Sequence, residues 1–299
     1  MWVDQILQGV LLGGYYALIA CGLSFMFGVM RIINLAHGSI AVLAAYLVWM
    51  VAEQWKISPF LALVAVLPVM AAAGWLLQRT VLERSLRSGA LTPLLSTFGL
   101  AIVLDNLMFE RFGADTRSLA PNIGDLAFNS WSLPGGITVG YLALLTFVVA
   151  VALLGGLALF LDRTKLGRSI RATAEDADTA ELVGVDSRRV YAAATAIALM
   201  TVAIAGTFLA MRATFDPYAG STQLIFAFEA IVIGGAGSLW GTLVGGIVLG
   251  VAQNLGSQIS PQGFLIAGHT VFLAILGARF LLAGRDPRAL VHALRRKSA

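Results

Sequence analysis

Long apolar stretches recur from one end of this 299-residue chain to the other, separated by polar connections. A helix needs roughly 20 apolar residues to cross a membrane core about 30 Å thick. Stretches near or above that length occupy residues 5–27, 37–53, 59–78, 93–112, 137–161, 190–211, 224–257 and 262–284. They lack the strict alternation of barrel strands, and lipid offers the backbone no hydrogen-bond partner. The pattern therefore predicts an all-α, polytopic transmembrane helical bundle.

The composition supports the same class of protein. Hydrophobic residues make up 59% of the chain and charged residues 12%, and the mean hydropathy is +0.86, which lies outside the range of soluble domains. The single cysteine, Cys21, excludes an internal disulfide and a cysteine-rich metal site, and no metal site is expected. We expect one transmembrane domain over residues 1–299.

The basic residues predict the orientation of the chain. Of the 20 lysines and arginines, all but Lys56, Arg111, Arg117 and Arg212 fall on one side if the N-terminus is outside. The positive-inside rule then places the N-terminus in the periplasm and the C-terminus, with the basic segment 285–299, in the cytoplasm. The basic balance reflects this orientation and contact with anionic lipid, and no nucleic-acid partner is expected.

Opposite termini require an odd number of crossings, whereas the apolar stretches number eight. The stretch 224–257 is the longest and is interrupted by "GGAGSLWG" at residues 234–241. Glycine weakens a helix and allows left-handed turns. We therefore expect two helical pieces there, one of them re-entrant, and about eight to nine membrane segments in all.

The cytoplasmic loop 162–190 is highly charged and helical by propensity. Small residues recur in it at three- and four-residue steps, which on a helix makes a smooth face beside acidic neighbours. Such a helix fits a groove on another protein, although an ordinary solvated connector explains the charges as well. The residues of this candidate coupling helix are Ala174, Glu175, Asp176, Ala177, Ala180 and Gly184.

A few polar groups lie inside the apolar stretches, where charge is costly. Asp105 lies late in its stretch, where snorkelling or a nearby arginine explains it structurally. Glu229 precedes the glycine break and either caps free helix amides or lines a passage. Asn34 and His37 stand where the second stretch begins, so they satisfy backbone groups at a helix boundary or serve a pathway. His269, on an otherwise apolar helix, is expected to be a packing or hydrogen-bonding residue.

Small residues and hydroxyls inside the apolar stretches are expected to have local structural roles. Glycines three or four apart at residues 9–22 and 241–250 allow helices to approach closely. The hydroxyls of Ser96 and Thr97 can bond to their own helix.

Motifs for catalysis and nucleotide binding are missing from the sequence: it has no G-x-x-x-x-G-K-[ST] loop, no H-E-x-x-H and no clustered Cys and His. We therefore expect a protein that moves a solute and is not an enzyme.

Four separated stretches carry a family resemblance. They are "GLSFMFGVMRIINLAHGSIAVLAAYL" (22–47), "LLSTFGLAIVLDN" (94–106), "LGRSIRATAEDADTAELVGVDSRRVYAAATAIALMTVAIAG" (166–206) and "FEAIVIGGAGSLWGTLVGGIVLGVAQNLG" (228–256). Together they resemble the inner-membrane permease of branched-chain amino acid ABC transporters, whose relatives carry urea or short-chain amides. The resemblance implies a bacterial inner-membrane location and four kinds of partner: a second homologous permease, two cytoplasmic ATPase subunits, a periplasmic solute-binding protein and the lipid bilayer. ATP would bind to the partner subunits, so no cofactor is expected in this chain.

The resemblance also implies where the translocation pathway runs. It assigns to that pathway a break between helices near the cytoplasmic end, together with polar and glycine positions of other stretches: Asn34, His37, Gly38, Ser39, Ser96, Thr97, Glu229, Gly234 and Gly235. Family members often have an acidic residue at the position of Ser39 and a proline at that of Thr242. The loop residues 174–184 would receive the push of the ATPases.

An ion-coupled secondary transporter or channel is the alternative from another class. It would need intramembrane ion ligands, for which Asp105 and Glu229 are the candidates. The charged cytoplasmic loop argues against it, because a self-powered carrier does not require such a loop.

Overall fold

A computed structural model describes residues 2–89 and 91–283, and most of these residues are helical. The basic segment 285–299 lies outside the described residues. The elements in chain order are α1 (Trp2–Met30), α2 (His37–Trp55), α3 (Pro59–Leu77), a π-helix (Gln78–Leu82), α4 (Glu83–Arg87), α5 (Thr92–Phe112), a 3-10 turn (Ala120–Ile123), α6 (Asp125–Phe128), β1 (Ser130–Leu133), β2 (Ile137–Gly140), α7 (Tyr141–Arg163), α8 (Lys165–Glu175), α9 (Ala177–Leu182), α10 (Ser187–Arg212), α11 (Gly220–Gly234), α12 (Leu239–Ser257) and α13 (Gly263–Ala283).

Within the described residues, eight helices are long and apolar enough to cross a membrane, and α11 is a shorter apolar helix. The all-α bundle is therefore confirmed. The expected break of residues 224–257 is confirmed as well: α11 ends at Gly234, α12 begins at Leu239, and Gly235 and Gly237 between them have φ of 101° and 85°. Ser238 caps α12 by accepting a hydrogen bond from the Gly241 amide at 3.1 Å.

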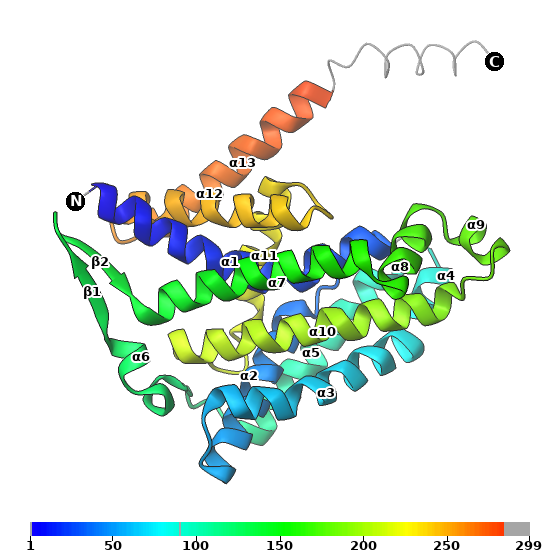
Figure 1. Ribbon diagram of the computed structural model, residues 1–299, viewed down its shortest axis with the longest axis horizontal. Coiled ribbons are helices and arrows are strands. Elements are labelled where there is room, and N and C mark those ends of the chain that lie inside the picture. Colours follow the sequence, from blue (N-terminus) through cyan, green and yellow to red (C-terminus); the bar gives the residue numbers. More distant parts are fainter. Residues whose placement is uncertain (1, 90, 284–299) are drawn as a thin grey trace.

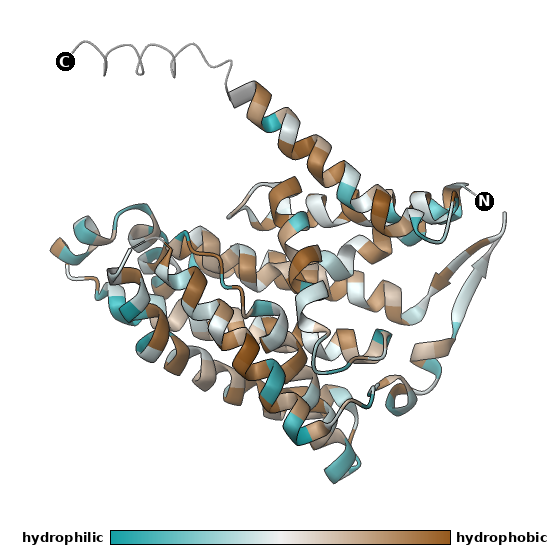
Figure 2. Cartoon of the chain, turned by 180° about the vertical axis from the view of Figure 1, so that it is seen from behind, coloured by the Kyte–Doolittle hydropathy of each residue, from teal (hydrophilic) through white to brown (hydrophobic). Residues whose placement is uncertain are grey.

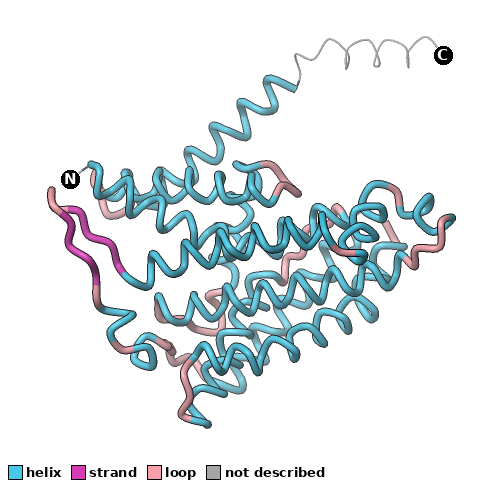
Figure 3. Tube along the Cα trace, in the orientation of Figure 1, coloured by secondary structure: helices cyan, strands magenta, loops and turns pink. Residues whose placement is uncertain are grey.

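The long helices α1, α3, α7, α10 and α12 run roughly side by side (Figure 1). The N-terminus and the antiparallel hairpin β1–β2 lie at one end of them, which we call the hairpin end (Figure 3). Helices α4, α8 and α9 lie at the opposite end, the α8–α9 end (Figure 1). Hydrophobic residues follow the lengths of the long helices, and hydrophilic residues gather at helix ends and connections (Figure 2).

Helix α1 lies at the core of the bundle, and 89% of an apolar 18-residue segment of this helix is buried inside the protein. It packs against α12 through glycines on both sides: a Cβ added to Gly13 would lie 2.4 Å from Ile247 Cα, and one added to Gly246 would lie 2.5 Å from Gly13 O. The prediction of close helix approach is thus confirmed for this pair, because no side chain larger than hydrogen fits there. The outer helices α3, α5, α7 and α13 have mostly exposed apolar faces.

Candidate functional site

The six residues 31–36 form a non-helical segment that starts at the exposed Arg31 and ends inside the bundle. The His37 Nε2 atom lies 2.7 Å from Ile19 O, and Ile19 is eleven residues before the end of α1 at Met30. Eleven helical residues span about 16 Å, a distance that six extended residues can cover. The chain therefore turns at Arg31 (φ 53°) and runs back along α1 to about the middle of that helix, where α2 begins.

Such backbone is tolerated at membrane depth only where protein buries it, and the contacts of this segment meet that condition. Asn34 and His37 are both 0% exposed. The Leu35 amide donates to Thr97 Oγ1 at 3.0 Å, and the Ala36 amide donates to Asn34 Oδ1 at 3.0 Å. The predicted helix-boundary role of Asn34 is therefore confirmed.

The same two side chains keep unused polar atoms. Among the described residues, Asn34 Nδ2 and His37 Nδ1 are buried and have no hydrogen-bond partner. Such atoms are uncommon in proteins. The break therefore retains hydrogen-bonding capacity that its own fold does not use.

Gly38 brings α11 against the break. A Cβ added to Gly38 would lie only 1.8 Å from Gly220 O, so the start of α2 and the start of α11 touch backbone to backbone. Helix α11 thus begins deep in the bundle, as a re-entrant piece would, and continues to Gly234 near the α8–α9 end, where Gly237 lies against Gly28 of α1.

A cavity of about 360 Å³ opens between this break, α5, α11 and α13. Its walls are almost entirely apolar, with one carboxylic residue among them: Ile33, Leu35, Leu94, Leu224, Ile225, Phe228, Glu229 and Phe272. The structure thus brings together three separate stretches that the sequence assigned to a pathway.

The carboxylate of Glu229 pairs with His269 Nδ1 of α13. Glu229 is 3% exposed, and its Oε2 atom is buried and has no partner among the described residues. The alternative in which Glu229 caps helix amides is wrong, because its Oε1 atom pairs with His269 and no amide of the described residues donates to its Oε2 atom. The expectation that His269 hydrogen-bonds is confirmed.

Of the predicted pathway residues, Glu229 lines this cavity and the others do not. Asp105 Oδ1 is buried and has no hydrogen-bond partner among the described residues. Thr97 also donates to Pro93 O of its own helix, as expected. The hydroxyl of Ser96 instead lies 2.8 Å from that of Ser85, directed toward α4.

Gly234 and Gly235 serve the turn between α11 and α12. A Cβ added to Gly234 would lie 1.8 Å from Gly241 O, and Gly235 adopts a left-handed backbone that favours glycine. Their position is therefore explained by local structure, and neither lines the cavity.

A second set of polar side chains was missed by the sequence reasoning. Tyr15 donates to Gln223 Oε1 at 2.6 Å. Tyr16 hydrogen-bonds to Gln253 Oε1, and Gln253 Nε2 is buried without a partner among the described residues. These pairs join α1 to α11 and α12. The Tyr16 ring also packs against the Phe226 ring in a tilted arrangement, with 5.1 Å between the ring centres. The available signal was Gln253 inside the apolar stretch 224–257 and Gln223 directly before it.

The loop expected to form one coupling helix contains two helices. Helix α8 ends at Glu175, and Asp176 leaves the helical region (φ −154°, ψ 107°) and caps α9 by accepting from the amides of Asp178 and Thr179. The single helix 174–184 is therefore a wrong prediction, because an aspartate that can bond the amides ahead of it favours a new helix start.

The expected small-residue face is also partly wrong. Ala180 is 4% exposed and faces the protein, while Gly184 lies beyond α9 with φ 88°. Leu182 and Val183 are 87% and 78% exposed at the tip of the loop. The side chains free to meet another protein are thus these two and acidic neighbours such as Glu175 and Glu181.

Eight membrane-length helices, a buried break in the backbone and an apolar cavity with a single acidic side chain define a multi-pass membrane transport protein. The family model described as "Branched-chain amino acid transport system / permease component" matches residues 5–283. The chain belongs to this family.

Several curated relatives are similar over most of their length. The high-affinity branched-chain amino acid transport system permease protein BraD of Pseudomonas aeruginosa is 32% identical over 269 residues, covering 86% of this chain and 87% of the relative. The permease protein LivH of the corresponding Escherichia coli system is 30% identical over 271 residues, 86% of each chain. A probable LivH of Methanocaldococcus jannaschii is 28% identical over 93% of this chain and 90% of its own length. No solved structure shows a significant match to the chain.

Proposed function

We propose that this chain is the permease subunit of an ABC importer that carries a branched-chain amino acid or a related small polar solute across the bacterial inner membrane. The observation that carries the proposal is the family match, which includes all the membrane-length helices between residues 5 and 283. The relatives' names specify branched-chain amino acids. The leucine, isoleucine and phenylalanine walls of the cavity suit an apolar side chain.

The orientation follows from the distribution of charge. The α8–α9 end carries most of the basic residues of the described chain, and the hairpin end carries few. We infer that the hairpin end and the N-terminus face the periplasm, and that α8, α9 and the C-terminus face the cytoplasm.

Four partners complete the proposed transporter. A second homologous permease and lipid share the exposed apolar faces of α3, α5 and α13. A periplasmic binding protein hands over the solute at the loops 113–136 and 212–223, of which the second leads from the hairpin end into the start of α11. Two cytoplasmic ATPase subunits bind ATP, and this chain binds none.

We place the ATPase contact at α9 and the turn after it. The exposed Leu182 and Val183 give the contact an apolar centre, and Glu175, Asp176 and Glu181 give it charge. Helix α8 transmits a push into the bundle because Ile170 and Gly167 are buried against α7 and its neighbours. Ala180 is buried beneath the loop, and Ala174 and Ala177 are half-buried beside it.

Reconstitution tests the proposal. Proteoliposomes with this chain, its partner permease, both ATPases and the binding protein should accumulate leucine, isoleucine or valine only when ATP is present. The purified chain alone should hydrolyse no ATP. Leucine uptake by the chain alone, driven by a proton or sodium gradient, would instead establish the ion-coupled alternative, for which the Glu229–His269 pair is the relevant feature.

A further inference from the structure

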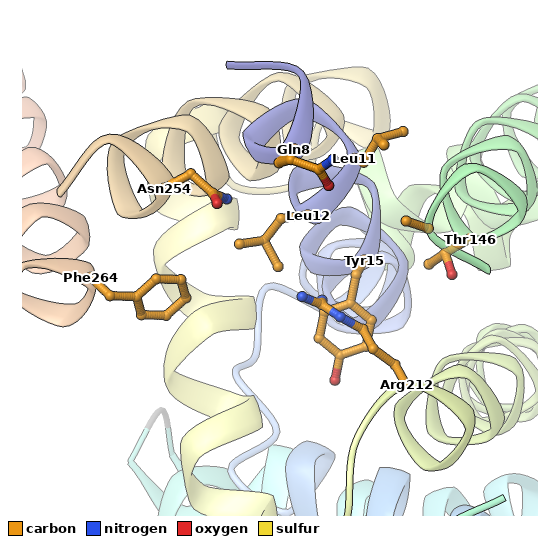
Figure 4. A pocket seen from close by; sticks show the side chains of 9 residues that line it. Gln8, Leu11, Leu12, Tyr15, Thr146, Arg212, Asn254 and Phe264 are labelled. Atoms are coloured by element: carbon orange, nitrogen blue, oxygen red, sulfur yellow. The ribbon is translucent and has the colours of Figure 1, made fainter. Parts of the chain in front are cut away.

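A second pocket lies at the hairpin end, away from the cavity described above. It has a volume of about 160 Å³ and is bounded by α1, α7, α10, α12 and the start of α13. Figure 4 shows Arg212, Gln8 and Asn254 arranged around one space, with Leu12 and Phe264 beside it. The pocket is of a size for a small polar solute, well below that of drug-binding sites.

Arg212 supplies a partly solvent-exposed cation that no acid of the described residues neutralises. Its guanidinium carbon lies 5.0 Å from the centre of the Tyr15 ring, which holds the side chain over the pocket. Among the described residues, no carboxylate lies within ion-pair distance of it. An arginine beside apolar helices without a counter-charge favours an anionic ligand, and its planar fork matches a carboxylate.

The two amide side chains of the pocket present acceptors. Gln8 Nε2 donates to Thr138 O at 2.5 Å, and Asn254 Nδ2 donates to Gly250 O at 3.2 Å. These bonds orient the amides, and they leave Gln8 Oε1 and Asn254 Oδ1 free to accept hydrogen bonds. Carbonyl-type oxygens suit an ammonium group and disfavour a phosphate.

The remaining walls are mostly apolar, and the hydroxyl of Thr146 among them donates to Leu142 O of its own helix. Leu11, Leu12 and Phe264 line the pocket beside the polar groups. One small space therefore offers a cation, neutral acceptors and a hydrophobic surface.

We propose that this pocket receives an apolar α-amino acid as a zwitterion: Arg212 binds its carboxylate, the amide oxygens of Gln8 and Asn254 bind its ammonium, and Leu11, Leu12 and Phe264 contact its side chain. The inference rests on the proposed function and names the substrate class at a periplasmic receiving site. Tyr15 lines this pocket and donates to Gln223 of α11, the helix whose Glu229 borders the other cavity.

Binding to the full chain in nanodiscs tests the site without the binding protein. Radiolabelled leucine should bind, and neither leucinamide, which lacks the carboxylate, nor isocaproate, which lacks the ammonium, should compete well. Arg212→Gln should weaken leucine binding by about 10- to 100-fold, because it removes a hydrogen bond between charged groups. Arg212→Lys, which keeps the charge, should lose less.

Arg111→Gln is the matched control. Arg111 is also an exposed arginine held over an aromatic ring, at 5.5 Å from the centre of Phe112, and it lies at the same end of the bundle outside this pocket. Leucine affinity should be unchanged in this variant. Equal thermal stability of the two glutamine variants would show that a loss at Arg212 comes from the site and not from misfolding.

Uptake by the assembled transporter separates failure of this inference from failure of the proposed function. Intact ATP-driven leucine uptake and intact leucine affinity in Arg212→Gln would overturn the receiving site and leave the permease function standing. Absence of branched-chain amino acid uptake by the unmodified transporter would overturn the function itself. If phosphatidylglycerol or phosphatidylethanolamine in the nanodisc occupies the pocket and leucine does not bind, the site is a lipid-headgroup site and the inference is wrong.

Discussion

The contact between Gly38 and Gly220 predicts how the break responds to the substitution Gly38→Ala. A Cβ at Gly38 would lie 1.8 Å from Gly220 O, whereas ordinary contacts begin near 3.4 Å. In Gly38→Ala, the starts of α2 and α11 must therefore separate by about 1.6 Å. Both sides of the contact are backbone, so no side chain can rotate out of the way.

The magnitude follows from two opposing effects. Overpacking of this kind costs about 1–3 kcal/mol, while alanine in place of a helical glycine returns up to about 1 kcal/mol. We expect a net loss of stability and a fall of roughly 2–10 °C in the midpoint of thermal inactivation. Because α11 carries Glu229 and most of one cavity wall, ATP-driven uptake should fall as well.

Gly99→Ala is the control for this prediction. Gly99 lies in the membrane-length helix α5, and a Cβ added there would meet nothing within 4 Å. The same chemical change should therefore be neutral or slightly stabilising at that position. If purified Gly38→Ala matches Gly99→Ala in both thermal inactivation and uptake, the close contact does not exist and the deep start of α11 is refuted.

Three further changes test other parts of the structure. Thr97→Val leaves the Leu35 amide without its acceptor and should cost about 1–3 kcal/mol; thermal inactivation should show the loss, and Thr97→Ser should restore stability. Glu229→Gln keeps the shape of the side chain and its bond to the histidine but removes the charge, so ATP-driven uptake should persist; abolished uptake would favour ion coupling. Hydrogen bonds from Thr179 lower the pKa of the Asp176 carboxyl below its usual value of 3.8, so the charged cap is complete at neutral pH and is lost only as the pH falls through that lowered pKa. Asp176→Ala should therefore speed amide exchange in α9 at pH 7, while unchanged exchange would contradict the capping role.

Much of the bundle follows from local sequence. Apolar length alone predicts most spans, because the bilayer sets one minimum length for every crossing helix. The division of residues 224–257 is predictable too, since the glycines at 234, 235 and 237 both weaken the helix and permit positive φ.

The depth of the break, in contrast, could not be predicted from local sequence. Nothing local to residues 31–36 indicates that they climb back along α1, because that path depends on the His37 contact with Ile19, and on Thr97 from another helix. The tyrosine–glutamine pairs are equally hidden, because more than 200 positions separate their partners in the chain. In contrast, the start of α9 was predictable from the local sequence. Asp176 is of a residue type that caps helix starts, and its side chain accepts hydrogen bonds from the amides of Asp178 and Thr179.

The same contacts indicate which element moves during transport. Helix α1 is joined to α12 through interlocking glycines along several turns, so these two helices are expected to move as a unit. Helix α11 is the shortest of the apolar helices, and non-helical residues 213–219 and 235–238 flank it. Non-helical residues next to a helix are the usual positions of hinges. Because α11 carries both Gln223, which holds Tyr15, and Glu229, which borders the cavity, a shift of this one helix would release the tyrosine and reshape the cavity together. We therefore expect α11 to couple the pocket at the hairpin end with the cavity near the break.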